Sequence, residues 1–526
     1  MKVTCRECRP RRLFIVSLLA ALSACQPSAP APAEESDTAV ESAVDPYWSV
    51  AELRGAMTAG DVTATEVVQA SLDRIIALDD EGPRLRAVIA VDDAALEQAA
   101  QADLDLPLGG VPVLVKANID MGAVLPTHAG ALAIADHYAP DEAFLVQQLR
   151  RAGALVIGTT NLSEWANFRD HRSVSGWSGV GGQTKNPYVL NRNPCGSSSG
   201  SAVAVAAGFV PIAIGTETHG SVVCPAGANG VVGIKPTLGL VSRDGIIPIA
   251  ASQDTAGPMA RSVADAAAAL QAIAVQDPRD PAAAAHRGVT DMLAYLQADA
   301  LAGARVGVWR RYYGAGNFPG VEALYESALV HLTDAGAVLV DPVGLSSDDE
   351  MVDASYQVLL HEFQAGLRAY AQGAFSLDDV IAFNRRNRAA AMPWFGQSLL
   401  LESREAVLTD DAYAKQLAAG RGEMRNLLRD TFEKFDLDFV VAPTNAPAAT
   451  TDVVLGDRFG LSSSSLAALS GRPAVTLPMG DVQGLPVGIS LLGQAWQDAR
   501  LLGYAHALEL RLPARLKPEF VPALEP

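Results

Sequence analysis

The sequence predicts an α/β fold: one large domain whose central β-sheet is covered by helices on both faces. Helical patterns alternate along the chain with short apolar runs, which are typical of strands buried on both faces. Six such runs occur, at residues 111–115, 154–157, 210–214, 439–442, 474–477 and 487–491. Of the 526 residues, 49% are hydrophobic and only 19% are charged, which suits a globular protein rather than a coiled coil. No linker rich in proline or glycine divides this body, so we expect one domain, although the length alone would allow about three.

Charge and cysteine content exclude two broad classes. The formal net charge is −19, from 40 basic and 59 acidic residues. An acidic protein is a poor partner for nucleic acid, since binding there depends on clustered lysine and arginine. Five cysteines in a chain of this length are too few for a disulfide framework.

The first 24 residues predict an export signal. Residues 1–12 carry five basic side chains and one acidic one, and residues 13–24 are an apolar run. Twelve helical residues span about 18 Å, less than the ~30 Å of a bilayer core, so this run is a signal segment rather than a membrane span. The run ends Leu22-Ser23-Ala24-Cys25, which is similar to a bacterial lipobox. We therefore expect a lipid on Cys25 and an outer-membrane-anchored periplasmic lipoprotein; the alternative is a soluble periplasmic protein.

The rest of the chain divides into a tether and a body. Residues 25–45 consist largely of proline, alanine and acidic residues, and we expect a solvated tether. Residues 46–526 form the predicted domain. It begins with two capping boxes, at Ser49 with Glu52 and at Thr63 with Glu66. Residues 320–420 are richer in helical pattern and predict a helical insertion that shapes a pocket, with Trp394 and Phe395 as candidate walls.

Three segments carry candidate chemistry. Lys116 ends an apolar strand, where a lysine is unusual; it is either a snorkelling strand-end residue or a desolvated amine with a lowered pKa that acts as a base. Residues 194–202 are rich in glycine and serine, and the simple interpretation is a flexible loop that caps a helix. Residues 215–225 follow a strand and place several backbone N–H groups around Ser221, as an oxyanion hole requires, although a plain strand-exit loop has the same pattern.

Together these segments resemble the amidase signature family of serine hydrolases. The matching segments are Val113–Lys116, Cys195–Ala202, Gly215–Ser221, Asn229–Thr237, Ser252–Met259 and Gly484–Ser490. The resemblance covers most of the chain from about residue 47. Residues 161–168 and 241–248 are similar to bacterial peptide amidases, which deamidate the C-terminal carboxamides of peptides. The resemblance also implies that the central sheet is twisted and mixed.

The resemblance implies a Ser–Ser–Lys triad. Ser221 would be the nucleophile, Ser197 the bridging serine after a non-proline cis peptide at Gly196, and Lys116 the base. A serine hydroxyl needs such a base, and lysine can serve only when its neutral form is populated. The backbone N–H groups of Thr218, His219, Gly220 and Ser221 would stabilise the oxyanion before an acyl-enzyme forms and water hydrolyses it.

The chain departs from the family pattern at two positions. The triad lysine is often followed by aspartate, but here Ala117 follows it, and position 219 is often glycine or aspartate, but here it is histidine. The oxyanion donors are backbone groups, so His219 is compatible with catalysis; its side chain either faces the pocket or is solvated. Cys195 and Cys224 flank the two serines, and we expect buried free thiols, with a disulfide as the alternative in an oxidising periplasm.

Four other functions compete with this interpretation. Residues 196–200 match the G-x-S-x-G nucleophile elbow, with Ser198 as nucleophile and His506 as base, but no strand pattern precedes them. The eight histidines show no HExxH spacing, so we expect neither a metal nor another cofactor. A non-catalytic binding lipoprotein would not need all three triad residues. A tRNA-dependent amidotransferase subunit would be separated by export from its cytoplasmic partners. The expected partner is a small or peptide amide, with no nucleic acid and no obligate protein partner.

Overall fold

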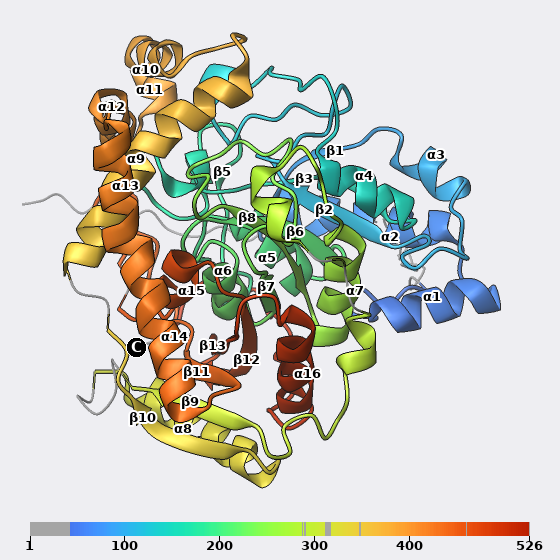
Figure 1. Ribbon diagram of the computed structural model, residues 1–526. Helices are drawn as coiled ribbons and strands as arrows, with labels where there is room; N and C mark the ends of the chain where they lie inside the picture. The colour runs from blue at the N-terminus through green and yellow to red at the C-terminus, as the bar shows by residue number, and fades with distance from the viewer. Residues whose placement is uncertain are drawn as a thin grey trace, which may run out of the picture. The chain divides into compact units, whose positions relative to one another are not determined.

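The central sheet has eleven strands in the order β1-β3-β2-β6-β8-β7-β12-β13-β11-β9-β10 (Figure 1). A computed structural model describes residues 43–286, 288, 291–310, 317–346, 349–458 and 460–524. The predicted signal segment, Cys25 and nearly all of the tether lie outside these residues. The strands of the sheet are β1 (Val88–Val91), β2 (Pro112–Lys116), β3 (Leu155–Thr160), β6 (Ile212–Glu217), β7 (Val232–Lys235), β8 (Thr255–Ala260), β9 (Arg305–Trp309), β10 (Val338–Val343), β11 (Phe439–Pro443), β12 (Ala474–Val482) and β13 (Leu485–Leu492).

The sheet is mixed, as predicted. Strand β2 pairs in parallel with β3 and β6, whereas β6 pairs antiparallel with β8. At the other end, β12 and β13 are antiparallel, and β9 is parallel to both β10 and β11. All six apolar runs in the sequence lie in these strands. The short pair β4 (Trp177–Ser178) and β5 (Gly182–Gln183) forms a separate two-stranded sheet.

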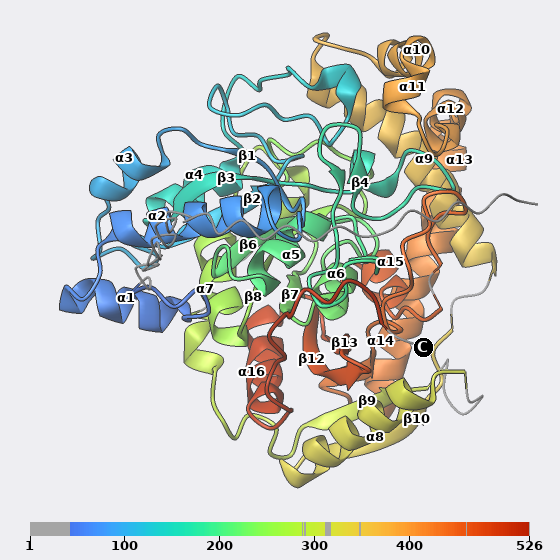
Figure 2. The ribbon, with the colours of Figure 1, turned by 180° about the vertical axis from the view of Figure 1, so that it is seen from behind.

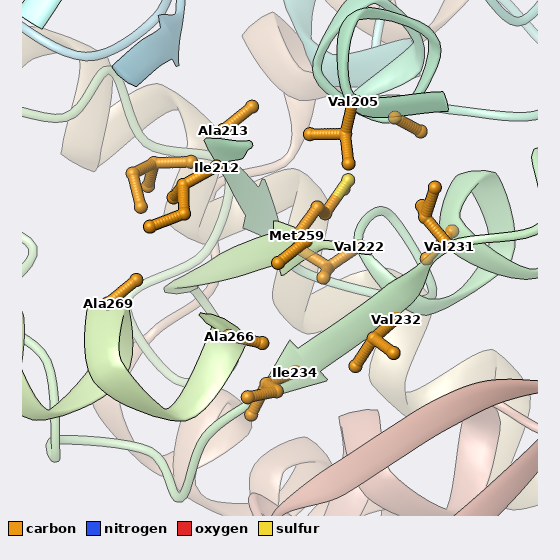
Figure 3. Close-up of a cluster of buried hydrophobic side chains, with 14 of the residues drawn as sticks. Val205, Ile212, Ala213, Val222, Val231, Val232, Ile234, Met259, Ala266 and Ala269 are labelled. Atoms are coloured by element: carbon orange, nitrogen blue, oxygen red, sulfur yellow. The ribbon is translucent and has the colours of Figure 1, made fainter. Parts of the chain in front are cut away.

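Helices cover both faces of the sheet. Figure 3 shows β6, β7 and β8 between α5 (Ser199–Ala206) on one side and α7 (Val263–Ile273) on the other. Val205 of α5 and Ala266 of α7 are fully buried, as are Ile212, Val232 and Met259 of the strands between them. Burial of apolar area on both faces is the main stabilising contribution to such a layered arrangement. The remaining helices near this part of the sheet are α1 (Val50–Ala59), α2 (Ala64–Ile75), α3 (Ala95–Ala100), α4 (Phe144–Arg151), α6 (Val223–Ala228), α15 (Ser465–Ser470) and α16 (Asp498–Glu509).

Both predicted capping boxes are present. The Ser49 side chain accepts from the N–H of Glu52 and Thr63 accepts from that of Glu66, and each glutamate bonds back to the cap residue. These caps set where α1 and α2 begin.

The segment predicted as a helical insertion is only partly helical. Residues 338–343 form the edge strand β10, which α8 (Pro319–Asp334) connects in parallel to β9. A helical layer follows, most of it seen at the upper left of Figure 1 and the upper right of Figure 2, with its last helix lower in both views. Its helices are α9 (Asp349–Ala371), α10 (Leu377–Arg386), α11 (Arg388–Ala391), α12 (Ser398–Glu405), α13 (Asp410–Leu417) and α14 (Glu423–Phe435).

This layer is joined to the body by buried polar contacts. Arg169, which is fully buried, forms an ion pair with Glu164 at 2.8 Å and donates to the carbonyl groups of Ala391 and Gly396. The described part of the chain contains no helix that is both long and apolar enough to cross a membrane.

Candidate active site

The candidate site lies where two parallel strands end side by side. Val115 of β2 pairs with Ile214 of β6, so Lys116 and Thr216 reach the same edge of the sheet. Ligand sites of α/β proteins form at such carboxyl ends. The Lys116 Nζ atom donates to the Thr216 Oγ1 atom at 2.8 Å and to the Thr216 carbonyl oxygen at 3.3 Å. The third donation goes to the Ser197 Oγ atom at 2.7 Å, so the structure brings two of the predicted residues together.

Burial changes the acidity of Lys116. The side chain is 0% exposed, and its hydrogen bonds go to neutral oxygens. Burial disfavours the charged amine and lowers the pKa of Lys116 to about 7, although Asp254 and Glu217 act in the opposite direction. A large part of the lysine is therefore neutral near pH 7 and able to accept a proton. This is the desolvated amine of the sequence hypothesis, and the snorkelling alternative is wrong.

The Ser197 loop contacts the Ser221 loop through the backbone. The peptide bond between Gly196 and Ser197 is cis, as the resemblance implied. The Ser197 carbonyl oxygen accepts from the N–H of Ser163 at 3.0 Å. The next residue, Ser198, donates its N–H to the Ser221 carbonyl oxygen at 3.1 Å. The two serine-bearing segments, 24 residues apart in the chain, thus lie in direct contact.

Residues 218–221 connect β6 to α6 and present free backbone donors. Within the described residues, the N–H groups of His219, Gly220 and Ser221 have no hydrogen-bond acceptor in the protein. Gly220 has φ +81°, and a Cβ atom there would lie 2.8 Å from the Ser464 Oγ atom, so only glycine fits. Consecutive free N–H groups beside a serine hydroxyl are suited to stabilising an oxyanion.

Two carboxylates that the sequence analysis did not single out hold this loop and the residues after it. The Glu217 Oε2 atom accepts from the N–H groups of Val222 and Val223 at 2.8 and 3.0 Å. Asp254 uses both oxygens: Oδ1 accepts from the Thr218 hydroxyl at 2.5 Å, and Oδ2 accepts from two N–H groups at 2.8 Å. Burial raises the pKa of Asp254 to about 6 against these bonds, which lower it. Both residues lie in segments that resemble the amidase signature family, and this position was the sequence signal that could have identified them.

A cavity of about 200 Å³ lies next to this edge of the sheet. Its lining includes Asn118, Thr216, Thr218, Ile247 and Asp254. Neither aromatic residue proposed as a pocket wall belongs to this lining. Trp394 is half exposed, and Phe395 is buried against Trp177 with ring centroids 5.0 Å apart.

The two departures from the family pattern differ in exposure. Ala117 is fully buried, and its carbonyl oxygen accepts from the N–H groups of His128 and Ala129. The His219 side chain is exposed, and its Nε2 atom lies 3.1 Å from the Ser465 Oγ atom.

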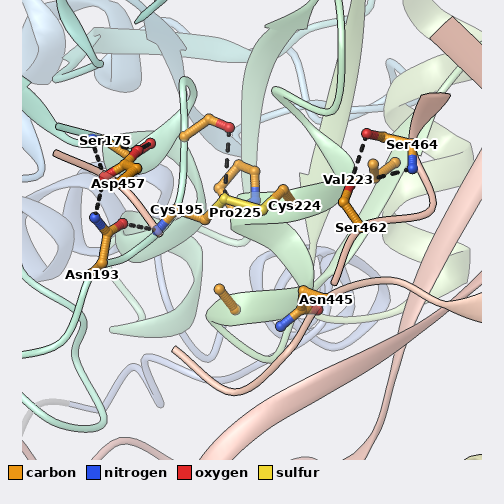
Figure 4. The surroundings of a disulfide bond; sticks show 12 residues. Ser175, Asn193, Cys195, Val223, Cys224, Pro225, Asn445, Asp457, Ser462 and Ser464 are labelled. Carbon is orange, nitrogen blue, oxygen red and sulfur yellow. Dashed lines mark hydrogen bonds between the residues drawn. A yellow bond between two sulfur atoms is a disulfide. The ribbon is translucent and has the colours of Figure 1, made fainter. Parts of the chain in front are cut away.

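Cys195 and Cys224 form a disulfide, so the expectation of free thiols is wrong. Their Cα atoms are 6.0 Å apart, and the bond is drawn in Figure 4. The two residues are 29 positions apart in the sequence, which says nothing about spatial distance. The sulfur atoms meet because the fold places the Ser197 segment next to the Ser221 segment.

The nucleophile-elbow alternative fails on geometry. The Ser198 Oγ atom donates to the Thr216 carbonyl oxygen at 3.1 Å and accepts from the Thr216 N–H at 3.2 Å, so it is a structural group. No strand leads directly into this serine, and His506 lies inside α16, where its nearest charged neighbour is Glu509. The described residues also include no group of three or more potential metal-ligating side chains.

The fold and the site together define a hydrolase, and comparison with known proteins identifies its family. A model of the amidase family matches residues 66–502. The crystal structure of a native peptide amidase from Stenotrophomonas maltophilia superimposes with a TM-score of 0.84 at 47% identity, covering 90% of this chain and 98% of that one. A probable amidase of Arabidopsis thaliana is 33% identical over 90% of this chain and 91% of its own length. A glutamyl-tRNA(Gln) amidotransferase subunit of Symbiobacterium thermophilum is also 33% identical, over 88% of this chain and 96% of its own length.

The chain belongs to the amidase signature family. It is an amidase, a hydrolase of amide C–N bonds with close structural similarity to peptide amidases.

Asp254, which binds Thr218, and Glu217, which binds the N–H groups of Val222 and Val223, give a matched pair of variants. Asp254→Asn should lower kcat about tenfold to hundredfold, because an amide nitrogen cannot accept the bonds that one carboxylate oxygen now receives. Glu217→Gln should stay within about threefold of wild type, since Oε1 has no hydrogen-bond partner and the amide oxygen can replace Oε2. Steady-state ammonia release measures both, and equal losses would contradict the assigned roles.

Proposed function

We propose that this amidase releases ammonia from the C-terminal carboxamides of peptides through a Lys116–Ser197–Ser221 triad and an acyl-enzyme. The observation that carries the proposal is the 2.7 Å hydrogen bond from the buried Lys116 amine to the Ser197 hydroxyl. Burying an amine is costly, so an apolar pair at this position would serve the fold equally well. The contact therefore points to a chemical role. A neutral lysine in that position is a base for a serine relay.

In the first half of the reaction, the Ser221 hydroxyl attacks the carboxamide carbon. Its proton passes to Ser197, which in turn gives its own proton to neutral Lys116. The negative charge that develops on the carbonyl oxygen is stabilised by the free N–H groups of His219, Gly220 and Ser221, with Thr218 as a further candidate donor. One such donor is typically worth about 3–4 kcal/mol in the transition state.

In the second half, the relay runs in reverse. Protonated Lys116 returns a proton through Ser197 to the leaving nitrogen, the C–N bond of the tetrahedral intermediate breaks, and ammonia departs to leave the acyl-enzyme. Water then attacks the ester of Ser221 and gives a proton through Ser197 to Lys116. The bond to the Ser221 oxygen breaks, the proton returns through Ser197 to that oxygen, and the acid product is released. Both half-reactions require the lysine to change charge, which a pKa near neutrality makes inexpensive.

Similarity supports the choice of peptide amides. Of the three proteins compared above, the peptide amidase shares the most residues with this chain, and the resemblance extends over 90% of it. A panel of substrates at equal concentration tests this choice: peptide C-terminal amides, amino-acid amides, fatty amides, aryl amides, and peptides with internal asparagine or glutamine. We expect kcat/KM to be highest for peptide amides and no ammonia from internal side-chain amides. A clear preference for fatty or aryl amides would contradict the substrate while leaving the triad intact.

The triad predicts a specific pH dependence. Since only neutral Lys116 accepts a proton and its pKa lies near 7, kcat/KM should rise between pH 5 and pH 8 with an inflection near pH 7. Lys116→Arg, which stays charged throughout this range, should lose about a thousandfold at pH 8 and should lack the inflection near pH 7. Lys185→Arg is the control, because the Lys185 amine binds only the Pro83 carbonyl oxygen. Activity of the Lys116 variant within tenfold of wild type would contradict the base assignment.

We also propose that residues 1–24 direct export, that Cys25 carries the lipid anchor, and that residues 25–45 tether the domain of residues 46–526 to the membrane. The support is the leader pattern and the lipobox-like end at Cys25. Cell fractionation tests this proposal. Wild type should be found with the outer membrane, and Cys25→Ser should leave it; release of both into the soluble periplasmic fraction would favour the unlipidated alternative.

A further inference from the structure

The Cys195–Cys224 disulfide joins the two segments that carry the candidate catalytic serines. Cys195 lies two residues before Ser197, and Cys224 lies three residues after Ser221, in the first turn of α6. Figure 4 shows the bond between the loop that leads into α5 and the start of α6. The covalent link therefore spans the same gap across which Ser197 and Ser221 must exchange a proton.

On each side, the cysteine is fixed to its own serine segment. The N–H of Cys195 donates to the Asn193 Oδ1 atom at 2.7 Å, and the Ser199 hydroxyl donates to the Cys195 carbonyl oxygen at 2.5 Å. The N–H of Cys224 donates to the Gly220 carbonyl oxygen at 2.8 Å. A shift of Cys224 is thus passed directly to the residue that precedes Ser221.

Hydrogen bonds also connect the two segments. The Ser198 N–H donates to the Ser221 carbonyl oxygen at 3.1 Å, and the Ser198 hydroxyl donates to the Thr216 carbonyl oxygen and accepts from the Thr216 N–H. The Asn229 side chain donates to the Pro194 carbonyl oxygen at 2.8 Å, and the disulfide is the covalent link among these contacts. The helices themselves are anchored independently, because α5 is buried along its whole length against the sheet and α6 packs on β7, β12 and β13. Breaking the disulfide should therefore leave the helices in place and loosen mainly the loops between them.

We propose that this disulfide is a positioning element for catalysis, so that amide hydrolysis is fast only in the oxidised protein. The inference rests on the proposed triad. A hydrogen-bond relay is sensitive to displacements of about 1 Å, and a covalent link across the relay limits such displacements. The bond also fits the expected export, since disulfides persist in oxidising compartments.

The disulfide borders a small cavity. Both cysteines line this cavity of about 40 Å³, together with residues 445–450, 457, 458, 460 and 461. A dithiol reductant attacks one sulfur atom to form a mixed disulfide, and its second thiol then releases both cysteines. Two electrons and two protons pass to Cys195 and Cys224, and the reductant becomes a cyclic disulfide. A disulfide oxidant reverses the exchange.

Reversible reduction of the folded enzyme tests the proposal. After treatment with dithiothreitol, confirmed by two new thiols in the body on titration, kcat for a peptide amide should fall at least tenfold while KM stays within about twofold. Removal of the dithiol and reoxidation should restore kcat. The double variant Cys195→Ser/Cys224→Ser is the matched control: it should have the low kcat with or without dithiothreitol.

Near-UV circular dichroism and thermal midpoints distinguish a loss of catalytic positioning in the folded enzyme from a loss of folded enzyme. A reduced enzyme that keeps kcat within twofold, or loses activity only in proportion to the fraction that unfolds, would overturn the proposal. The variants Ser221→Ala and Ser197→Ala keep the two failures distinct. If they retain activity, the triad itself is wrong; if they are inactive and the reduced enzyme is fully active, only the role of the disulfide is wrong.

Discussion

The structure depends on one unusual group, the fully buried amine of Lys116. An amine without a carboxylate partner in the interior is costly to charge, and its pKa falls toward 7 for that reason. Its three hydrogen-bond partners, two oxygens of Thr216 and the Ser197 hydroxyl, are neutral and include two hydroxyl groups, so the neutral amine can donate two bonds and accept one from a hydroxyl. Had a carboxylate taken one of these places, the lysine would remain protonated at neutral pH and could not act as a base. In the proposed mechanism, the lack of an ion pair to Lys116 among the described residues keeps the base available in its neutral form.

The acidic groups near the lysine serve the backbone instead. Glu217 and Asp254 raise the pKa of Lys116 only through space, while their oxygens accept from residues that follow or support the Ser221 loop. Residues farther from the lysine also support the Ser221 loop. Gln253 donates to the Thr218 carbonyl oxygen at 3.2 Å and accepts from Ser355 of α9, so the helical layer also helps to hold the loop. The sheet supplies the lysine, and the carboxylates and helices around it hold the loop that carries the proposed oxyanion donors.

Much of this could be predicted from the sequence, because the central strands are apolar on both faces. Strand β8 was missed since Gly257 and Pro258 interrupt its pattern, and β10 since its side chains are largely exposed at the edge of the sheet. Lys116 was identifiable as a charge at the end of an apolar strand, whereas the roles of Asp254 and Glu217 depend on loop geometry that no local pattern encodes. The disulfide was only the alternative to buried free thiols, because spacing alone does not show that two loops meet.

The central claim is that Ser221 is the nucleophile and that Lys116 activates it through Ser197. Covalent labelling with a fluorophosphonate, followed by peptide mapping and mass spectrometry, tests it directly. The account predicts one modified residue, Ser221, and labelling that is at least a hundredfold slower in Lys116→Ala and in Ser197→Ala. Labelling of Ser198 instead, or labelling of Ser221 in these variants at the wild-type rate, would contradict it.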